Sequence, residues 1–206
     1  GTTYGAFSIS GSSRNGTSAS YNKVRPYLAE AVTINSGISQ MTSTAFWQIG
    51  ELTNGFRFTG LPDQRALRLN TPGGGAGGAV TCTVLNPFTG NSVNVPNVDL
   101  CGIRVYGGVF TDIGSVATGN SAAITVDSNT ASPRVGIDIQ NNTFTDVLAA
   151  IRLDTCDYCI AKNNNIDISK PLNGSATIKT GIIGSSEGNF VHVINNTITN
   201  SNAQAG

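Results

Sequence analysis

The sequence contains little charge of either sign. Twelve Lys and Arg residues balance twelve Asp and Glu residues in a chain of 206, so the net charge is zero. A nucleic-acid partner calls for a basic face against its phosphates, and this balance argues against one. The chain also lacks a polybasic or amphipathic stretch and any run near the ~18 apolar residues of a membrane-spanning helix. We therefore expect no nucleic-acid partner and no membrane insertion.

Residues that commonly hold metals are scarce as well. The chain has one His and four Cys. The segment CDYC at residues 156–159 resembles half of a redox or zinc site, but no second pair with matching spacing accompanies it. Cys101 and Cys159 fall at inward positions of the repeats described next, which favours buried free thiols. We expect no metal and no cofactor.

What the sequence has in quantity is a repeat. The segment VHVINNTITNS (residues 191–201) recurs as GIDIQNNTFTD (136–146), as CIAKNNNIDIS (159–169) and, more loosely, as GIRVYGGVFTD (102–112). Superimposing the turns gives two columns, the first of Gly108, Asn142, Asn164 and Asn196, and the second of Phe110, Phe144, Ile166 and Ile198. A second motif, AAITVDSN and AAIRLDTC, lies between these segments, so each repeat contains two or three short strands.

The spacing of the repeats favours stacked strands over helices. Successive members of the second column are 34, 22 and 32 residues apart, and no 3.6-residue pattern appears. Stacking would turn each apolar column into a buried ladder, while asparagines at one bend could bond to the circuits above and below. We predict an all-β, right-handed, single-stranded parallel β-helix. A β-sandwich is the main alternative, although the repeats lack the tight Asn-Gly turns of antiparallel hairpins.

The first part of the chain does not repeat. We interpret residues 1–71 as a less regular N-terminal cap or lead-in segment and residues 72–206 as the β-helix, with Pro and Gly as the only boundary signal. Residues 20–32 predict a short helix, and the surroundings of Asn54 predict a hairpin. At the other end, the last strand runs into TNSNAQAG without a closing element. An open strand edge invites association, so we expect a fragment or a continuation into another domain or partner.

The xIxIxNNxIxN form of the repeats resembles the pectate-lyase-like superfamily of right-handed β-helices. That superfamily includes bacterial polysaccharide lyases, glycosidases and the tailspikes of bacteriophages, and the resemblance covers roughly residues 98–202. It implies a virion-borne or extracellular protein and, for tailspikes, a homotrimer that binds or cleaves surface polysaccharide. The single histidine, His192, lies in FVHVI and not in the Gly-His-Gly segment of polygalacturonases. A calcium cluster with paired arginines is also not evident, so a tailspike-like protein fits better than a pectinolytic one.

Three functions follow from this resemblance and from the surface chemistry. The first is a tailspike-like receptor-binding protein that recognises a cell-surface polysaccharide, with or without depolymerising it. It is supported by 23 Thr, 22 Asn and 19 Ser residues, whose hydroxyl and amide groups suit hydrogen bonding to sugars. The second is a non-catalytic structural or adhesive β-helix of a virion or bacterial surface. The third is a secreted polysaccharide lyase, which lacks its expected motifs.

A candidate catalytic site lies at the ends of the AAITVDSN and AAIRLDTC strands. Aligning them turns Asp127 and Asp154 outward in one column, with Thr125 and Arg152 beside them. Stacked side chains sit ~5 Å apart, close to the ~5–5.5 Å between the acid and the nucleophile of retaining glycosidases. We assign Asp154 as the acid, Asp127 as the nucleophile or base, and Arg152 and Thr125 to substrate binding. Against this, Asp near a strand end commonly caps a turn.

A further outward column contains Arg104, Asp138, Ile160 and His192. We expect Arg104 and Asp138 to form a plain surface ion pair, worth ~0–1 kcal/mol. His192 has no carboxylate in the preceding repeat of this column, and we expect it to be a solvated strand residue. We therefore predict that the catalytic residues are the two aspartates at the ends of the AAI strands, and we predict no catalytic role for this second column.

Overall fold

The structure is a computed structural model that describes residues 2–10, 15–27, 30–36, 39–42, 44–61, 65–69, 80–98, 100–114, 122–126, 134–169, 180–184 and 190–200. Within these ranges the regular elements are strands, β1 to β25, and no helix occurs. The prediction of an all-β protein is therefore confirmed.

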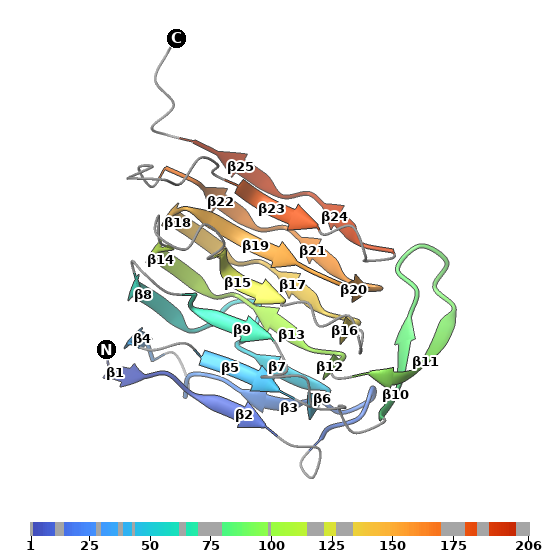
Figure 1. Ribbon diagram of the computed structural model, residues 1–206. Helices are drawn as coiled ribbons and strands as arrows, with labels where there is room; N and C mark the ends of the chain where they lie inside the picture. Colours follow the sequence, from blue (N-terminus) through green and yellow to red (C-terminus); the bar gives the residue numbers. More distant parts are fainter. Residues whose placement is uncertain are drawn as a thin grey trace.

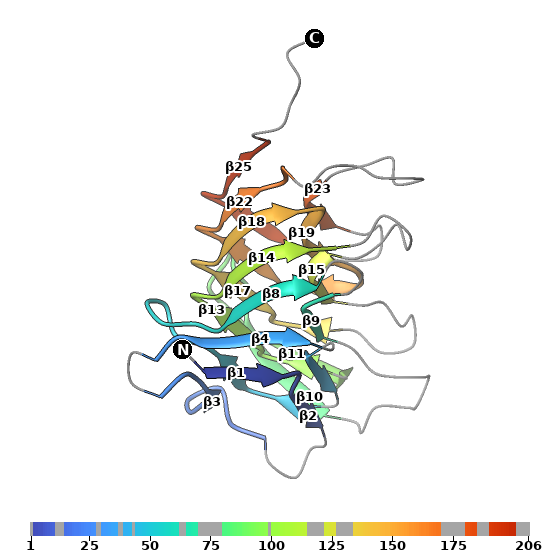
Figure 2. The same cartoon turned by 90° about the vertical axis from the view of Figure 1, so that its left-hand side faces the viewer.

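Four sheets of parallel strands form the body of the protein (Figures 1 and 2). Sheet A contains β1 (Thr2–Gly5), β4 (Val32–Ser36), β8 (Arg57–Leu61), β14 (Val109–Ile113), β18 (Thr143–Val147), β22 (Asn165–Asp167) and β25 (Thr197–Thr199). Sheet B contains β2 (Ser8–Ser10), β5 (Ser39–Thr42), β9 (Leu67–Leu69), β15 (Ala122–Val126), β19 (Ala149–Leu153) and β23 (Thr180–Gly184). Sheet C contains β6 (Thr44–Ala45), β12 (Leu100–Cys101), β16 (Arg134–Val135) and β20 (Cys156–Asp157). Sheet D contains β3 (Asn22–Val24), β7 (Trp47–Ile49), β13 (Arg104–Tyr106), β17 (Asp138–Gln140), β21 (Ile160–Lys162) and β24 (His192–Ile194).

The chain visits these sheets in a fixed order. From β6 to β9 it passes through sheets C, D, A and B, and the same succession recurs from β12 to β15, from β16 to β19 and from β20 to β23. Each passage, called a circuit below, pairs in parallel with the one before it. Antiparallel hairpins do not build these sheets, so the alternative of a β-sandwich is wrong.

One antiparallel hairpin stands outside this order. Strands β10 (Val80–Leu85) and β11 (Ser92–Val98) pair with each other and lie beside β12 and β16 of sheet C (Figure 1). A disulfide between Cys82 of β10 and Cys101 of β12 fastens the hairpin to the sheets.

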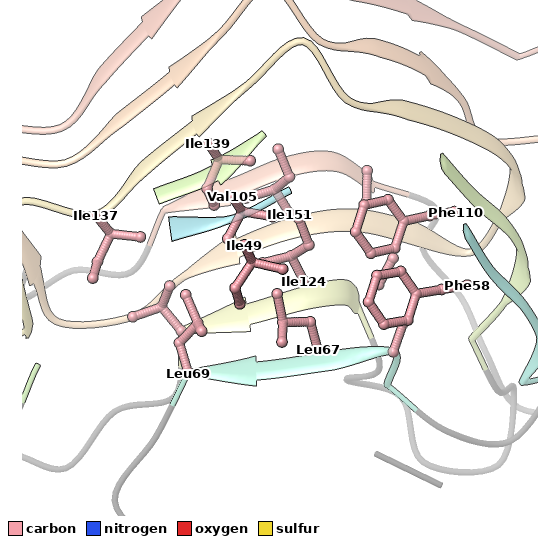
Figure 3. Packing of buried hydrophobic residues seen from close by; sticks show 14 of the residues in the cluster. Ile49, Phe58, Leu67, Leu69, Val105, Phe110, Ile124, Ile137, Ile139 and Ile151 are labelled. Carbon is pink, nitrogen blue, oxygen red and sulfur yellow. The ribbon is translucent and has the colours of Figure 1, made fainter. Parts of the chain in front are cut away.

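The core is built from columns of identical or similar apolar side chains. In sheet A, Phe58, Phe110 and Phe144 stack with ring centroids 4.8 Å apart in both pairs and interplanar angles of 5° and 12°. Ile166 and Ile198 continue the same register, so the predicted second column is confirmed. Figure 3 shows how Phe58 and Phe110 face side chains from sheets B and D. The partners that it labels include Ile49, Leu67, Val105, Ile124, Ile139 and Ile151.

The predicted asparagine column is confirmed by its hydrogen bonds. The Oδ1 atom of Asn142 accepts from the backbone N–H of Gly108 at 2.8 Å. Oδ1 of Asn164 accepts from both the backbone and the side-chain nitrogen of Asn142 at 3.0 Å. Oδ1 of Asn196 accepts in the same way from the backbone and the side-chain nitrogen of Asn164, at 3.0 and 2.8 Å. Each side-chain nitrogen also donates to a carbonyl of the preceding circuit, namely that of Val105, Ile139 or Ala161.

The doubled asparagines of the repeats divide two tasks between them. The first member of each pair, Asn141, Asn163 or Asn195, adopts a left-handed backbone with φ of 54°, 55° or 51°. Asn tolerates this conformation better than other non-glycine residues do. The second member then points inward and joins the ladder. One residue turns the corner, and the next ties adjacent circuits together.

The strands of the first 71 residues belong to the same sheets as the later ones. Ile34 of β4 lies opposite Phe58 of β8, which in turn lies opposite Phe110 of β14. The predicted boundary between residues 71 and 72 falls outside the described residues. The helix predicted in residues 20–32 is wrong, because residues 22–24 form β3, which bonds to β7, and β4 begins at Val32.

The hairpin predicted around Asn54 is correct only as a turn. Glu51 and Asn54 exchange backbone hydrogen bonds of 3.0 and 3.1 Å. The flanking strands β7 and β8 do not pair with each other, because they lie in sheets D and A. Parallel partners in neighbouring circuits satisfy their backbone groups instead.

Candidate functional site

The structure buries two residues of the predicted AAI-strand site, Thr125 and Asp154. Thr125 lies opposite Arg152 in sheet B, as the alignment predicts. Its side chain is nevertheless fully buried, and its hydroxyl donates to the carbonyl of Ala122 at 3.2 Å. Asp154 is only 4% exposed. Asp127 lies outside the described residues.

The expectation that Asp154 faces solvent is therefore wrong. Asp154 turns back toward the sheet, its backbone N–H donates to the carbonyl of Val126, and its Oδ2 lies 2.5 Å from Nε of Arg152. This contact is an ion pair and not an aligned hydrogen bond, since Nε of Arg152 makes none. A buried carboxylate needs such a partner, so the pair has a sufficient structural reason. The catalytic and binding roles of these residues stay predictions.

A groove lies elsewhere, between the β10–β11 hairpin and the outer face of sheet D. Its volume is about 400 Å³, within the ~300–1,000 Å³ usual for small-ligand sites. Its lining combines aromatic, aliphatic and charged side chains, which include Tyr21, Phe46, Val84, Arg104, Asp138 and Tyr158. We call it the hairpin groove.

The bend between sheets C and D shapes the hairpin groove. Five residues in successive circuits have left-handed backbones at this bend: Phe46 (φ 54°), Gly102 (61°), Gly136 (68°), Tyr158 (55°) and Phe190 (57°). A Cβ atom on Gly102 would lie 2.7 Å from the Phe46 ring, and one on Gly136 would lie 2.5 Å from Val84 of the hairpin. Gly102 and Gly136 therefore leave room for the Phe46 ring and the Val84 side chain. At the same bend, the circuits before and after these two glycines carry aromatic residues.

Both disulfides frame the hairpin groove. Cys82–Cys101 joins the hairpin to the residue before Gly102, and Cys156–Cys159 closes the bend that carries Tyr158. The prediction of free thiols is therefore wrong, and no free cysteine is found in the chain. Sequence reasoning failed because the pairing depends on the hairpin, which brings the Cα atoms of Cys82 and Cys101 to 5.5 Å.

An aromatic cluster extends one wall of the groove. The rings of Tyr158 and Phe190 stack with centroids 4.9 Å apart and planes inclined by 8°. Phe88, in the turn of the hairpin, stacks on His192 at 4.7 Å and contacts Phe190 at 6.2 Å. His192 is thus half-buried against a ring, and not simply solvated as predicted. The sequence signal for this wall was the column of aromatics and glycines that directly precedes Ile103, Ile137, Cys159 and Val191.

Asp138 forms the polar part of the groove floor. Its Oδ2 accepts from the hydroxyl of Tyr106 at 2.5 Å, and its Oδ1 accepts from Nε2 of Gln140 at 2.7 Å. Burial raises the pKa of Asp138, against the lowering effect of these two hydrogen bonds and of the Arg104 charge. Burial and the neighbouring Asp138 charge likewise raise the pKa of Tyr106.

Arg104 and Asp138 lie opposite each other in neighbouring strands, as predicted. The guanidinium of Arg104 does not simply lie against the carboxylate, because its Cζ sits 3.7 Å from the centroid of the Tyr21 ring. The Tyr21 ring in turn meets Phe46 edge-on at 5.7 Å. Arg104 and Asp138 therefore do not form the expected surface ion pair, and both belong to a partly buried cluster whose remaining contacts come from the first circuits.

We predict that Asp138→Asn alters the pH dependence of stability. A carboxyl whose pKa is higher in the folded state holds its proton more tightly there, so the free energy of unfolding falls as pH rises above about 4. The neutral amide cannot titrate. The variant should therefore gain stability relative to the parent between about pH 4 and pH 7, as measured by urea unfolding at several pH values.

A substitution that should make stability more dependent on pH serves as the control for this prediction. Tyr106→Phe removes a hydrogen bond that lowers the pKa of Asp138. The pKa should rise further, and stability should fall more steeply with pH. Parallel pH profiles for the parent and Asp138→Asn would contradict the assignment.

Metal-ligand clusters and membrane-spanning helices are not found in the described ranges. No group of three His, Cys, Asp or Glu side chains there has an arrangement that could hold a metal ion. No helix in those ranges is long and apolar enough to cross a membrane. No protein family, curated protein or solved structure matches this chain. The function of the groove must therefore follow from its own side chains.

Proposed function

We propose that this chain is a right-handed, single-stranded parallel β-helix of the tailspike-like kind that binds a cell-surface polysaccharide in the hairpin groove. The recurring order of sheets C, D, A and B supports the architecture. The observation that carries the function is the groove itself, with Phe46 and Tyr158 on its sides and Arg104 and Asp138 on its floor.

Polysaccharides suit this combination of groups. A sugar ring has apolar C–H faces that pack on aromatic rings, and hydroxyls at its edge that need hydrogen-bond partners. The aromatic side chains are held by backbone bends and stacking contacts, so little side-chain freedom is lost on binding. Rigid rings of this kind commonly supply much of the binding energy at an interface.

The disulfides are relevant to the localisation of the protein. Two of them occur in the chain, and disulfides persist mainly in extracellular, periplasmic or virion-surface settings. This supports the proposed localisation on a virion or outside the cell. Tailspikes assemble as homotrimers, and we propose the same state here, to be measured by light scattering.

Binding is better supported than cleavage at this groove. Hydrolysis by the common glycosidase mechanisms uses two carboxyl groups that flank the scissile bond. Among the described residues that line the groove, Asp138 is the one carboxyl, and its oxygens are already bonded to Tyr106 and Gln140. We therefore place polysaccharide recognition ahead of depolymerisation, and a purely structural β-helix behind both.

We predict that Tyr158→Gly lowers glycan affinity by about tenfold or more, because it removes one aromatic wall. Glycine accepts the left-handed φ of 55° at this position, so the bend should persist and the fold should be retained. A glycan array followed by titration of the best ligand measures the effect.

Tyr27→Ala is the matched control for Tyr158→Gly. Tyr27 is 73% exposed and does not line the groove. Its replacement should leave glycan affinity unchanged. A folded parent protein that binds no glycan on the array would leave only the structural interpretation.

A further inference from the structure

Cations outnumber anions on the strands of sheet D. These strands carry Lys23, Arg104 and Lys162 but a single carboxyl, that of Asp138. All four alternate with residues that pack in the core, so they stand on the outer face, along which the hairpin groove runs. This excess is local, because the whole chain has no net charge.

One of these cations already has a carboxylate partner. Lys23 lies 3.6 Å from the carboxylate of Glu51, which also pairs with Arg25 at 2.8 Å. Both oxygens of Asp138 accept hydrogen bonds from neutral donors, Tyr106 and Gln140, so its carboxylate interacts with the charge of Arg104 without contacting it. The cation that remains in the groove lining is Arg104.

The guanidinium of Arg104 is fixed in orientation, and although it lies in the field of Asp138, no carboxylate among the described residues contacts it directly. It lies over the Tyr21 ring at 3.7 Å, which holds its plane. In the part of the chain that the structure describes, no carboxylate forms an ion pair with it. A guanidinium offers several N–H donors in a rigid fork that matches a carboxylate bidentately.

We propose that the hairpin groove selects polysaccharides that carry carboxylates, such as those of uronic or sialic acids, and that Arg104 binds the sugar carboxylate. This rests on the proposed function of the groove. The sugar ring lies between Phe46 and Tyr158, which places its acid group toward the floor at Arg104. Arg104 determines specificity, while the aromatic walls contribute to the binding of any sugar.

The test compares acidic and neutral polymers on the intact chain. Affinities for polygalacturonate, hyaluronan and polysialic acid are measured beside those for dextran and cello-oligosaccharides by calorimetry. We expect at least one acidic polymer to bind roughly tenfold tighter than the neutral ones. Arg104→Gln should abolish that preference, and Arg104→Lys should restore it only in part because it lacks the fork. Arg57→Gln, an exposed arginine of sheet A, should change nothing.

The outcomes separate this inference from the proposed function. Neutral polymers that bind as tightly as acidic ones, with affinity lost in Tyr158→Gly, would overturn the charge selection and keep the glycan groove. An acidic preference that persists in correctly folded Arg104→Gln would also overturn the role of Arg104. Absence of binding to every polymer would overturn both proposals.

Discussion

Asn164→Ala should lower the free energy of unfolding by about 4 kcal/mol. The side chain of Asn164 bonds to the backbone and the amide of Asn142, to the carbonyl of Ile139 and to Oδ1 of Asn196. It is 1% exposed, so water cannot replace these partners. Each buried polar group left unsatisfied costs about 1–3 kcal/mol, and several are left at once. Urea unfolding followed by circular dichroism measures the loss.

The neighbouring asparagine is the matched control for this substitution. Asn165 belongs to the same strand end, but its side chain is exposed. Asn165→Ala should change the free energy of unfolding by less than about 0.5 kcal/mol. Equal effects of the two substitutions would show that the ladder does not stabilise the stack.

Phe110→Ala should lower the free energy of unfolding by a similar amount, about 4 kcal/mol. Its ring lies between those of Phe58 and Phe144, at 4.8 Å from each, and is fully buried. Truncation loses the transfer free energy of the ring and leaves a cavity between two stacked rings that the sheets hold in place. The same unfolding experiment measures it.

Two further substitutions test the cause of the effect. Phe110→Leu refills most of the volume and should cost only about 1–2 kcal/mol. Phe88→Ala removes a ring that is 54% exposed and should cost less than about 1 kcal/mol. If Phe110→Ala cost no more than Phe88→Ala, the stacked column would not be a main source of stability.

The core could be predicted from the sequence because its signals are local and repeated. Alternation of apolar residues gave the inward columns, and the doubled asparagines marked one bend in three circuits, as the hydrogen bonds of Asn142, Asn164 and Asn196 confirm. The earlier circuits were harder to see, because they share the register but not the motif. Phe58 occupies the same column as Phe110 without an Asn pair before it.

The hairpin groove could not be predicted for a different physical reason. Alternation tells which way a side chain leaves its sheet, but it does not tell what packs on that side. Thr125 does point away from the core column, yet it is buried. Asp138 is likewise placed correctly by register, while its surroundings come from Tyr21, Tyr106 and the β10–β11 hairpin, which is not part of the repeat.

The constant length of one segment of the later repeats has a consequence for how a linear ligand would be recognised. The number of residues from the left-handed bend to the apolar column of sheet A is the same at four successive bends, those at Gly102, Gly136, Tyr158 and Phe190. Variation in repeat length therefore falls in the sequence between a sheet A strand and the next such bend. Successive strands of sheet D are ~4.8 Å apart, so the outer face of this sheet presents outward side chains at regular intervals, and each can be replaced independently. A substitution at one such position can change the specificity for one unit of a bound polymer while the backbone of the sheets stays the same.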